Sequence, residues 1–176
     1  MNHRLHVRTQ RLELLSCSLE VAQAVITRNK SQVERLLGVR VPDDWYASEV
    51  LDIFPMYAQM LIDDPSQLGW GVWLMIHIAD SILIGDLGFI DKPDQTGTVK
   101  MGYEVLSAYR QQGFAFEALK ALVDFAFSGR ELKRIIAHSP DDHVASIRIL
   151  EKLGMQEIGR DENLLKWELK LESRQL

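Results

Sequence analysis

The sequence has one cysteine among its 176 residues and no apolar run that approaches the roughly 18 residues of a membrane span. Because Cys17 has no second cysteine to pair with, it cannot form an internal disulfide, which is typical of a reducing cytoplasm. Cys17 also lacks a neighbouring histidine or other base, which favours a small buried residue over a thiol nucleophile. Residues 1–8 contain no apolar run of the kind found in signal peptides. We therefore expect a cytoplasmic protein without a membrane partner.

An excess of positive charge is also absent. The chain has 20 Lys and Arg residues against 25 Asp and Glu, a formal net charge of −5, which argues against nucleic acid as the main partner. Residues 61–100 contain six acids and two bases, so this segment either attracts a cationic acceptor or forms a solvated acidic face. With 47% hydrophobic and 26% charged residues, the composition is that of a globular protein. The length suits a single domain over residues 1–176.

Hydrophobic spacing and turn residues predict a mixed α/β (α+β) chain. Alternating apolar residues predict strands at 11–15, 69–77, 82–90, 98–106, 134–138, 155–160 and 164–171. Helical spacing predicts helices at 19–28, 31–37, 47–62, 114–128 and 143–153, the third kinked at Pro55 and the last capped by Asp141 or Asp142. The crossover helix at 114–128 makes strands 98–106 and 134–138 a parallel pair. We expect the other strands to be antiparallel, in a twisted sheet of about six or seven strands.

The segment 103–119 is the most informative part of the sequence, because a strand leads through a short loop directly into a helix. The first-turn N–H groups of a helix have no helical acceptor and form the positive end of its dipole, so they favour an anion. Gly113 permits a tight turn close to a ligand, Ala115 keeps the first turn small, and Arg110 adds a cation. These residues predict a phosphate site; a glycine turn made for packing alone has the same local pattern. Neither a Walker loop nor a dinucleotide-binding glycine fingerprint is present.

Two motifs in this order resemble a known superfamily. Arg110-x-x-Gly113-x-Ala115, following strand 102–106, resembles the acetyl-CoA pyrophosphate motif Arg/Gln-x-x-Gly-x-Gly/Ala of the GNAT superfamily of N-acetyltransferases. The segment 139–155 resembles the next motif of that superfamily, Asn-x-x-Ser followed by a helix that ends in Leu-Gly-Phe. Together the motifs cover about residues 82–160. Their order and spacing are similar to those of the branch that acetylates ribosomal proteins (RimJ/RimL-like).

The resemblance implies a GNAT fold with the parallel pair at an acetyl-CoA cleft. It implies acetyl-CoA as co-substrate, no metal, and acetyl transfer to a primary amine by direct attack in a ternary complex. The acceptor would be a protein N-terminal α-amine or a small-molecule amine, and a homodimer is compatible with the sequence. Coenzyme contacts are implied for Tyr103, Val105, Arg110, Gln111, Gln112, Gly113, Phe114, Ala115, Phe116, His143 and Ser146.

The catalytic residues are less clearly implied, because the chain departs from the family pattern at three positions. Lys100 stands where many members have a carboxylate before the central Gly-Tyr, which leaves Glu104 as the nearest strand carboxylate and the predicted base, with Asp86 and His77 as alternatives. An α-amine with a pKa of about 7.7–8 needs only a weak base. Leu150 replaces the usual tyrosine acid, so the resemblance implies Ser146 as the acid.

A serine in a first helical turn can equally serve only its own backbone. The third departure is His143, at the usual asparagine position. These departures leave open a non-catalytic acyl-CoA-binding regulatory module, and chance matches of both motifs would leave a plain α/β interaction domain. Segment 38–62 would form the acceptor side in this superfamily, where four aromatic residues line a pocket or fill the core. They are Trp45, Tyr46, Phe54 and Tyr57.

Overall fold

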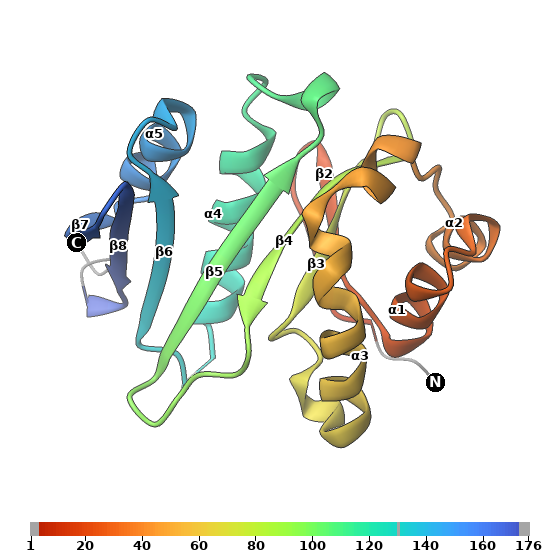
Figure 1. The fold of residues 1–176 in the computed structure, drawn as a ribbon, viewed down its shortest axis with the longest axis horizontal. Helices are drawn as coiled ribbons and strands as arrows, with labels where there is room; N and C mark the ends of the chain where they lie inside the picture. The colour runs from red at the N-terminus through yellow and green to blue at the C-terminus, as the bar shows by residue number, and fades with distance from the viewer. Residues whose placement is uncertain (1–3, 130, 173–176) are drawn as a thin grey trace.

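The computed structural model describes residues 4–129 and 131–172 and contains an eight-stranded sheet (Figure 1). The strand order is β1-β2-β3-β4-β5-β6-β8-β7. The strands are β1 (His6–Arg8), β2 (Leu12–Ser16), β3 (Val72–His77), β4 (Ile82–Ile90), β5 (Thr98–Val105), β6 (Arg134–Pro140), β7 (Gln156–Asp161) and β8 (Leu164–Lys170). The pair β5–β6 is parallel and the other neighbouring pairs are antiparallel. The predicted mostly antiparallel sheet with one parallel pair is therefore confirmed.

The sheet has one strand more than predicted, because β1 pairs with β2 at the edge. A strand of three residues is too short to show the alternation on which the prediction depended. The hydrogen bonds that define β1 come from its pairing with β2 at the edge of the sheet. Residues 6–8 by themselves contain no pattern that predicts a strand. The remaining strands lie within a few residues of their predicted bounds.

Helices cover both faces of the sheet. They are α1 (Leu19–Ile26), α2 (Lys30–Leu37), α3 (Phe54–Asp63), α4 (Phe114–Phe127) and α5 (Val144–Lys152). In Figure 1, α4 lies behind the sheet, whereas α1 and α3 lie on the viewer's side. Residues of α4 and α5 belong to one hydrophobic cluster and residues of α1, α2 and α3 to the other. None of the helices in 4–129 or 131–172 is long and apolar enough to cross a membrane.

The helix predicted at 47–62 is shorter than expected. Two 3-10 helices, η1 (Asp43–Ala47) and η2 (Glu49–Ile53), precede α3, which begins at Phe54. Proline lacks an N–H and has a fixed φ, so it is tolerated in a first helical turn but not in a helix interior. Pro55 occupies that first turn of α3. It marks the start of the helix and not a kink within it.

The predicted aspartate cap of α5 is also wrong. His143 is the N-cap residue of α5, and its side chain makes no capping hydrogen bond. The carboxylate of Asp141 instead accepts a hydrogen bond from Nη2 of Arg160 at 2.9 Å. The predicted end of the helix is correct: Gly154 follows the C-cap with a φ of +87°, a conformation that favours glycine.

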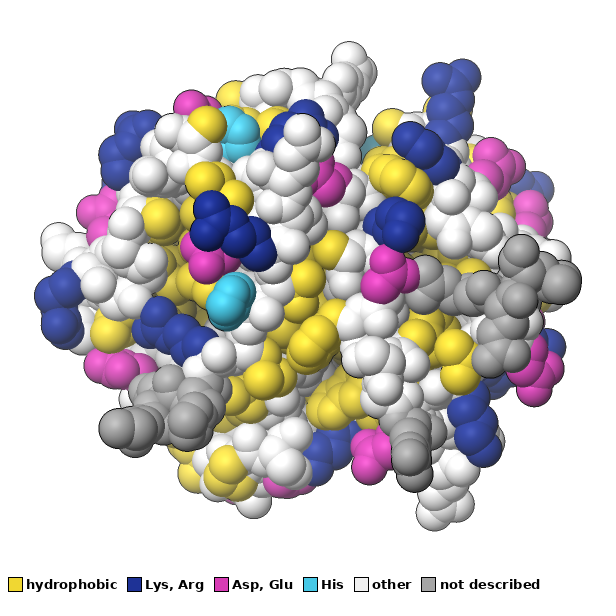
Figure 2. Space-filling view, turned by 180° about the vertical axis from the view of Figure 1, so that it is seen from behind, with side chains coloured by type: hydrophobic (Ala, Val, Ile, Leu, Met, Phe, Trp, Pro, Cys, Tyr) yellow, Lys and Arg dark blue, Asp and Glu magenta, His cyan; other side chains and the backbone are white. Residues whose placement is uncertain are grey.

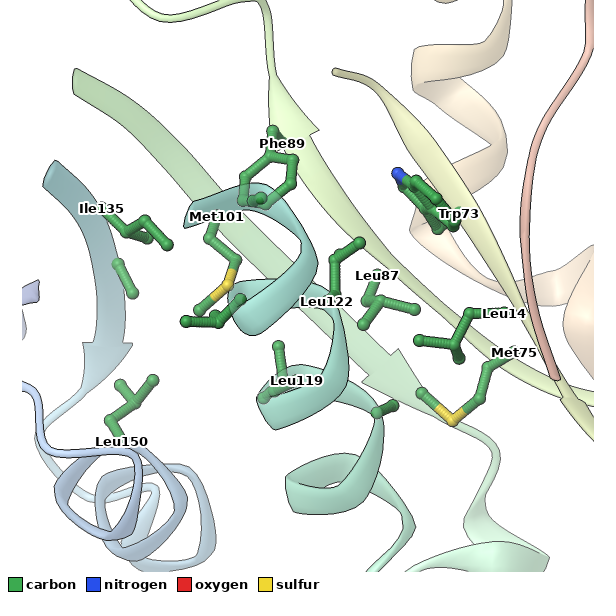
Figure 3. Packing of buried hydrophobic residues seen from close by; sticks show 14 of the residues in the cluster. Leu14, Trp73, Met75, Leu87, Phe89, Met101, Leu119, Leu122, Ile135 and Leu150 are labelled. Carbon is green, nitrogen blue, oxygen red and sulfur yellow. The ribbon is translucent and has the colours of Figure 1, made fainter. Parts of the chain in front are cut away.

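The two hydrophobic clusters explain most of the apolar pattern. Figure 3 shows Leu119 and Leu122 of α4 among sheet residues such as Met101, and Leu150 of α5 at the edge of the same cluster. On the other face, Trp45 and Phe54 are fully buried, Tyr57 is nearly so, and Tyr46 is partly buried. These aromatic residues are therefore mainly core. Cys17 belongs to the same cluster, and burial raises the pKa of its thiol well above its usual value, so it is not a nucleophile.

The face seen from behind in Figure 2 has apolar side chains gathered near its middle. An apolar hollow of about 240 Å³ is lined by Leu5, Trp70, Phe89 and Phe125, among others. It also includes Gly129, so it lies at the C-terminal end of α4, opposite to the end that the sequence predicts as a phosphate site. The hollow is not part of the candidate site.

Candidate active site

The loop from β5 into α4 presents a row of unused main-chain donors. Gln111 and Gly113 have φ values of +58° and +83°, and Gly113 is the N-cap of α4. Within residues 4–129 and 131–172, no acceptor is found for the N–H groups of residues 111–116, and the first helical hydrogen bond runs from Glu117 N to Gly113 O. Consecutive free N–H groups at a helix start form a concave anion site. The structure therefore brings the predicted residues 111–116 together.

The conformation of this loop depends on three residues whose role the sequence did not reveal, Thr9, Arg11 and Glu117. Glu117, in the first turn of α4, accepts hydrogen bonds from Oγ1 of Thr9 and from the N and Nε of Arg11, at 2.6–2.9 Å. Arg11 also donates from Nη1 to Gln112 O at 2.9 Å and stacks 4.2 Å from the ring centre of Phe114. These contacts join positions more than 100 residues apart, so no local motif signals them.

The edge of β5 offers a second set of main-chain groups. Parallel pairing with β6 ends at Met101 and Ala137, so the last residues of β5 have no strand partner on that side. Leu106 donates its N–H to Ile84 O of β4. Because main-chain groups alternate between the two sides of a strand, those of Tyr103 and Val105 point towards β6. Both residues were predicted as coenzyme contacts, and both lie at this open edge.

Arg110 follows the end of β5 in the chain, and its side chain reaches back to that strand. Its Nε donates to Val105 O at 2.7 Å, and its Nη2 lies 3.7 Å from Oε1 of Glu104. Its side chain is 57% exposed. The cation expected beside the helix start is thus held at the open strand edge by a carbonyl and a carboxylate.

Tyr103 and Ser146 meet across this edge. The hydroxyl groups of Tyr103 on β5 and Ser146 on α5 are 2.7 Å apart, and either can donate. Burial raises the pKa of Tyr103, and the hydrogen bond with Ser146 works against this shift. Leu150, where the resemblance would place a tyrosine, is fully buried in the core. His143 is exposed at the start of α5. A phenol hydroxyl therefore lies beside Ser146, on β5 and not on α5, a contact that the separate motifs did not predict.

Two carboxylates lie on the opposite face of the sheet. Asp86 of β4 and Glu104 of β5 are cross-strand partners, and Asp86 is also opposite Leu74, a core residue of the face covered by α1 to α3. Trp45 in η1 donates its Nε1–H to Oδ2 of Asp86 at 3.0 Å. Burial raises the pKa of Asp86 to about 7; the Trp45 hydrogen bond lowers it and the charge of Glu104 raises it. The close approach of β5 to β4 beside Asp86 requires Gly85, whose Cβ would lie 2.2 Å from Glu104 O.

His77, the other alternative base, is elsewhere. Its ring packs against Phe114 and Tyr109, with ring centres 4.9 and 5.7 Å away. Its Nδ1 lies 2.9 Å from Oδ2 of Asp80 without forming an aligned hydrogen bond. These contacts place His77 behind the β5–α4 loop on the α4 face, apart from Asp86 and Glu104.

Comparison with known proteins agrees with this arrangement. The family described as "Acetyltransferase (GNAT) domain" matches residues 11–156. The chain is 26% identical over 146 residues to the uncharacterized N-acetyltransferase YjdG of Bacillus subtilis (strain 168), covering 83% of this chain and 86% of that protein.

Two solved structures share the fold. A ribosomal-protein-S5-alanine acetyltransferase from Vibrio fischeri superposes with a TM-score of 0.67 at 14% identity, covering 94% of this chain and 96% of the other. RimL, a ribosomal L7/L12 α-N-protein acetyltransferase in complex with coenzyme A, gives 0.67 at 16% identity, covering 96% and 99%. The chain therefore belongs to the GNAT acetyltransferase family and is an acyltransferase enzyme.

Proposed function

We propose that this enzyme transfers the acetyl group of acetyl-CoA to a primary amine, on a protein N-terminus or a small molecule, by direct attack in a ternary complex. The observation that carries the proposal is the row of free N–H groups at residues 111–116. A diphosphate carries charge on several oxygens and therefore matches several adjacent donors at once. The side chain of Arg110 contacts Val105 O, whereas the guanidinium of Arg11 lies beside the helix start and donates to Gln112 O.

The open edge of β5 provides the path for the rest of the coenzyme. Pantetheine is a chain with amide groups, so it can pair with strand main-chain groups as another strand would. The N–H and C=O groups of Tyr103 and Val105 are the available partners. In the complex, Arg110 would release Val105 O to a pantetheine amide. An N–H at this edge would also stabilise the oxyanion formed when the thioester is attacked.

Ser146 and Tyr103 can supply the proton that the departing thiolate needs. As the C–S bond breaks, the Ser146 hydroxyl would donate a proton to sulfur, and Tyr103 would return a proton to Ser146 through their 2.7 Å contact. A proton from solvent, which receives the second N–H proton of the amine, would then restore Tyr103. A two-hydroxyl path accounts for the tyrosine missing from position 150. It also gives Ser146 a role besides the stabilisation of its own helix.

The test is release of CoA thiol from acetyl-CoA by the full chain, with a panel of amine acceptors that includes peptides with free N-termini, amino acids and polyamines. We expect thiol release that depends on the acceptor, and an acetylated product of matching mass. Calorimetry with acetyl-CoA alone gives the affinity of the coenzyme site. Tight binding without turnover over the whole panel would favour a regulatory acyl-CoA-binding module, and no binding would reject the site.

A further inference from the structure

Asp86 is a buried carboxylate without a cation of its own. It is 5% exposed, and within residues 4–129 and 131–172 it forms no ion pair. Trp45 donates to Oδ2 and no donor among these residues reaches Oδ1. A carboxylate buried with a single neutral donor is costly to keep charged. A hydrophobic residue would fill the same position at lower cost, so stability does not explain Asp86.

The position of Asp86 relates it to the coenzyme edge. Glu104, its cross-strand partner, directly follows Tyr103 on β5, and the two side chains point to opposite faces of the sheet. Beyond Met101, β5 has no partner strand towards β6. A thioester held at this edge from the α4 face can therefore be approached by an amine from the face where Asp86 and Glu104 lie.

We propose that Asp86 is the general base of the acetyl transfer and that Trp45 is a positioning residue that orients its carboxylate. The proposal rests on the proposed function. An acceptor ammonium gives one proton to Asp86, and the resulting nitrogen lone pair attacks the thioester carbonyl carbon. The C–S bond then breaks, and the amide forms with loss of a second N–H proton. One proton ends on the CoA sulfur, and the proton held by Asp86 is released to water.

Glu104 has a different role in this arrangement. Its side chain is 42% exposed and lies within 3.7 Å of Arg110, so it is more hydrated than Asp86 and is placed to attract a cationic amine. Its negative charge also raises the proton affinity of Asp86. Another titratable group near Asp86 is the thiol of Cys17, which burial keeps protonated. Both neighbouring influences, Trp45 and Glu104, can therefore be changed separately from Asp86.

The test is the pH dependence of kcat/KM in the thiol-release assay. We expect Asp86→Asn to lower kcat/KM by about 10²–10⁴-fold while acetyl-CoA affinity stays unchanged. Trp45→Phe removes a hydrogen bond that favours the charged carboxylate of Asp86. The acid limb of the kcat/KM pH profile of this variant should therefore move to higher pH by about 0.5–1 unit. Glu104→Gln should move the limb to lower pH. The titration of the acceptor amine itself does not shift in any variant.

Asp161→Asn is the matched control, because it neutralises an exposed carboxylate on β7, a strand separated from β4 by β5, β6 and β8. If the wild-type protein turns over and Asp86→Asn retains kcat/KM within a few-fold, this proposal is overturned and the proposed function stays intact. Loss of all turnover in Glu104→Gln would also overturn this proposal, because it would make Glu104 the base. So would acid limbs of the pH profile that are unchanged in both Trp45→Phe and Glu104→Gln. A wild-type chain without turnover would overturn both proposals.

Discussion

In the proposed function, the two faces of β5 recognise their ligands by different means. On the α4 face, the donors are main-chain N–H groups of residues 111–116 and of the strand edge at Tyr103 and Val105. On the opposite face, the chemistry depends on side-chain charge, with Asp86 and Glu104 opposite one another. Recognition by main-chain groups tolerates most changes of side chain, whereas recognition by two carboxylates does not. The first site should therefore fail only when the backbone or the local charge is altered.

On the coenzyme face, the largest effect is expected for Gly113→Glu. The substitution puts a negative charge beside the free N–H groups and a side chain on a residue with a φ of +83°. We expect acetyl-CoA affinity to fall by about 100-fold or more, equivalent to roughly 3 kcal/mol. Isothermal titration calorimetry with acetyl-CoA measures this loss.

Gly113→Asn is the control for backbone strain, because asparagine tolerates a positive φ better than most residues and carries no charge. Its Cβ would lie 3.3 Å from Nη2 of Arg11, the flexible end of a side chain. We expect Gly113→Asn and Gln112→Ala to bind acetyl-CoA within about tenfold of wild type. Unchanged affinity of Gly113→Glu would show that the diphosphate binds elsewhere.

The next effect concerns the two hydroxyl groups that join β5 and α5. Ser146→Ala and Tyr103→Phe each remove one hydroxyl of the 2.7 Å contact. If both serve one proton path, each should lower kcat by roughly 10–100-fold, and the double variant should be no worse than the poorer single variant. Steady-state kinetics of thiol release measures this. If the fold loss of kcat in the double variant equals the product of the two single losses, the two hydroxyl groups act independently.

The sequence predicts a site well when its residues lie in one segment and poorly when they come from distant parts of the chain. The proposed diphosphate site lies in one continuous segment, so Gly113 and its neighbours could be found from local pattern. The proposed acceptor face depends on Trp45 and Asp86, which are 41 residues apart, and on the register that puts Asp86 opposite Glu104. Register between strands is set by the whole sheet and not by either strand's own residues. For this reason the sequence indicates Asp86 only as one of two alternatives to Glu104, and Trp45 only as a core or pocket residue.

The same distinction holds for the fold. Long strands and helices with clear periods, such as β4 and α4, were predicted within a residue or so. Residues 47–53 were predicted as the first part of a regular helix but lie in or between η1 and η2, because Pro55 fits the first turn of α3 and not a helix interior. The prediction failed where the position of one proline decides where the helix begins.

A third prediction concerns stability on the acceptor face. The pKa of Asp86 is raised to about 7, above the value of about 3.9 in an unfolded chain. The folded state therefore binds the proton more tightly, and this contribution to stability is lost as pH rises from about 4 towards 7. Asp86→Asn removes the titration while its amide oxygen can still accept from Trp45. At pH 8 the variant should be more stable by roughly 1–4 kcal/mol, with little difference at pH 4, as measured by urea denaturation. An equal difference at both pH values would contradict the raised pKa.

The smallest expected effect tests the support of the coenzyme face. Although partial burial opposes it, hydrogen bonds from Thr9 and Arg11 lower the pKa of Glu117. A lowered carboxyl pKa gives stability that is present above the unfolded value and is lost as pH falls through the folded value. Because Arg11 is 39% exposed, solvent weakens the pair, and Glu117→Gln should cost about 1 kcal/mol at pH 7. Urea denaturation should show this difference shrinking at acidic pH. Acetyl-CoA affinity should fall only a few-fold, because Glu117 holds the loop through Thr9 and Arg11 and the N–H donors of residues 111–116 remain.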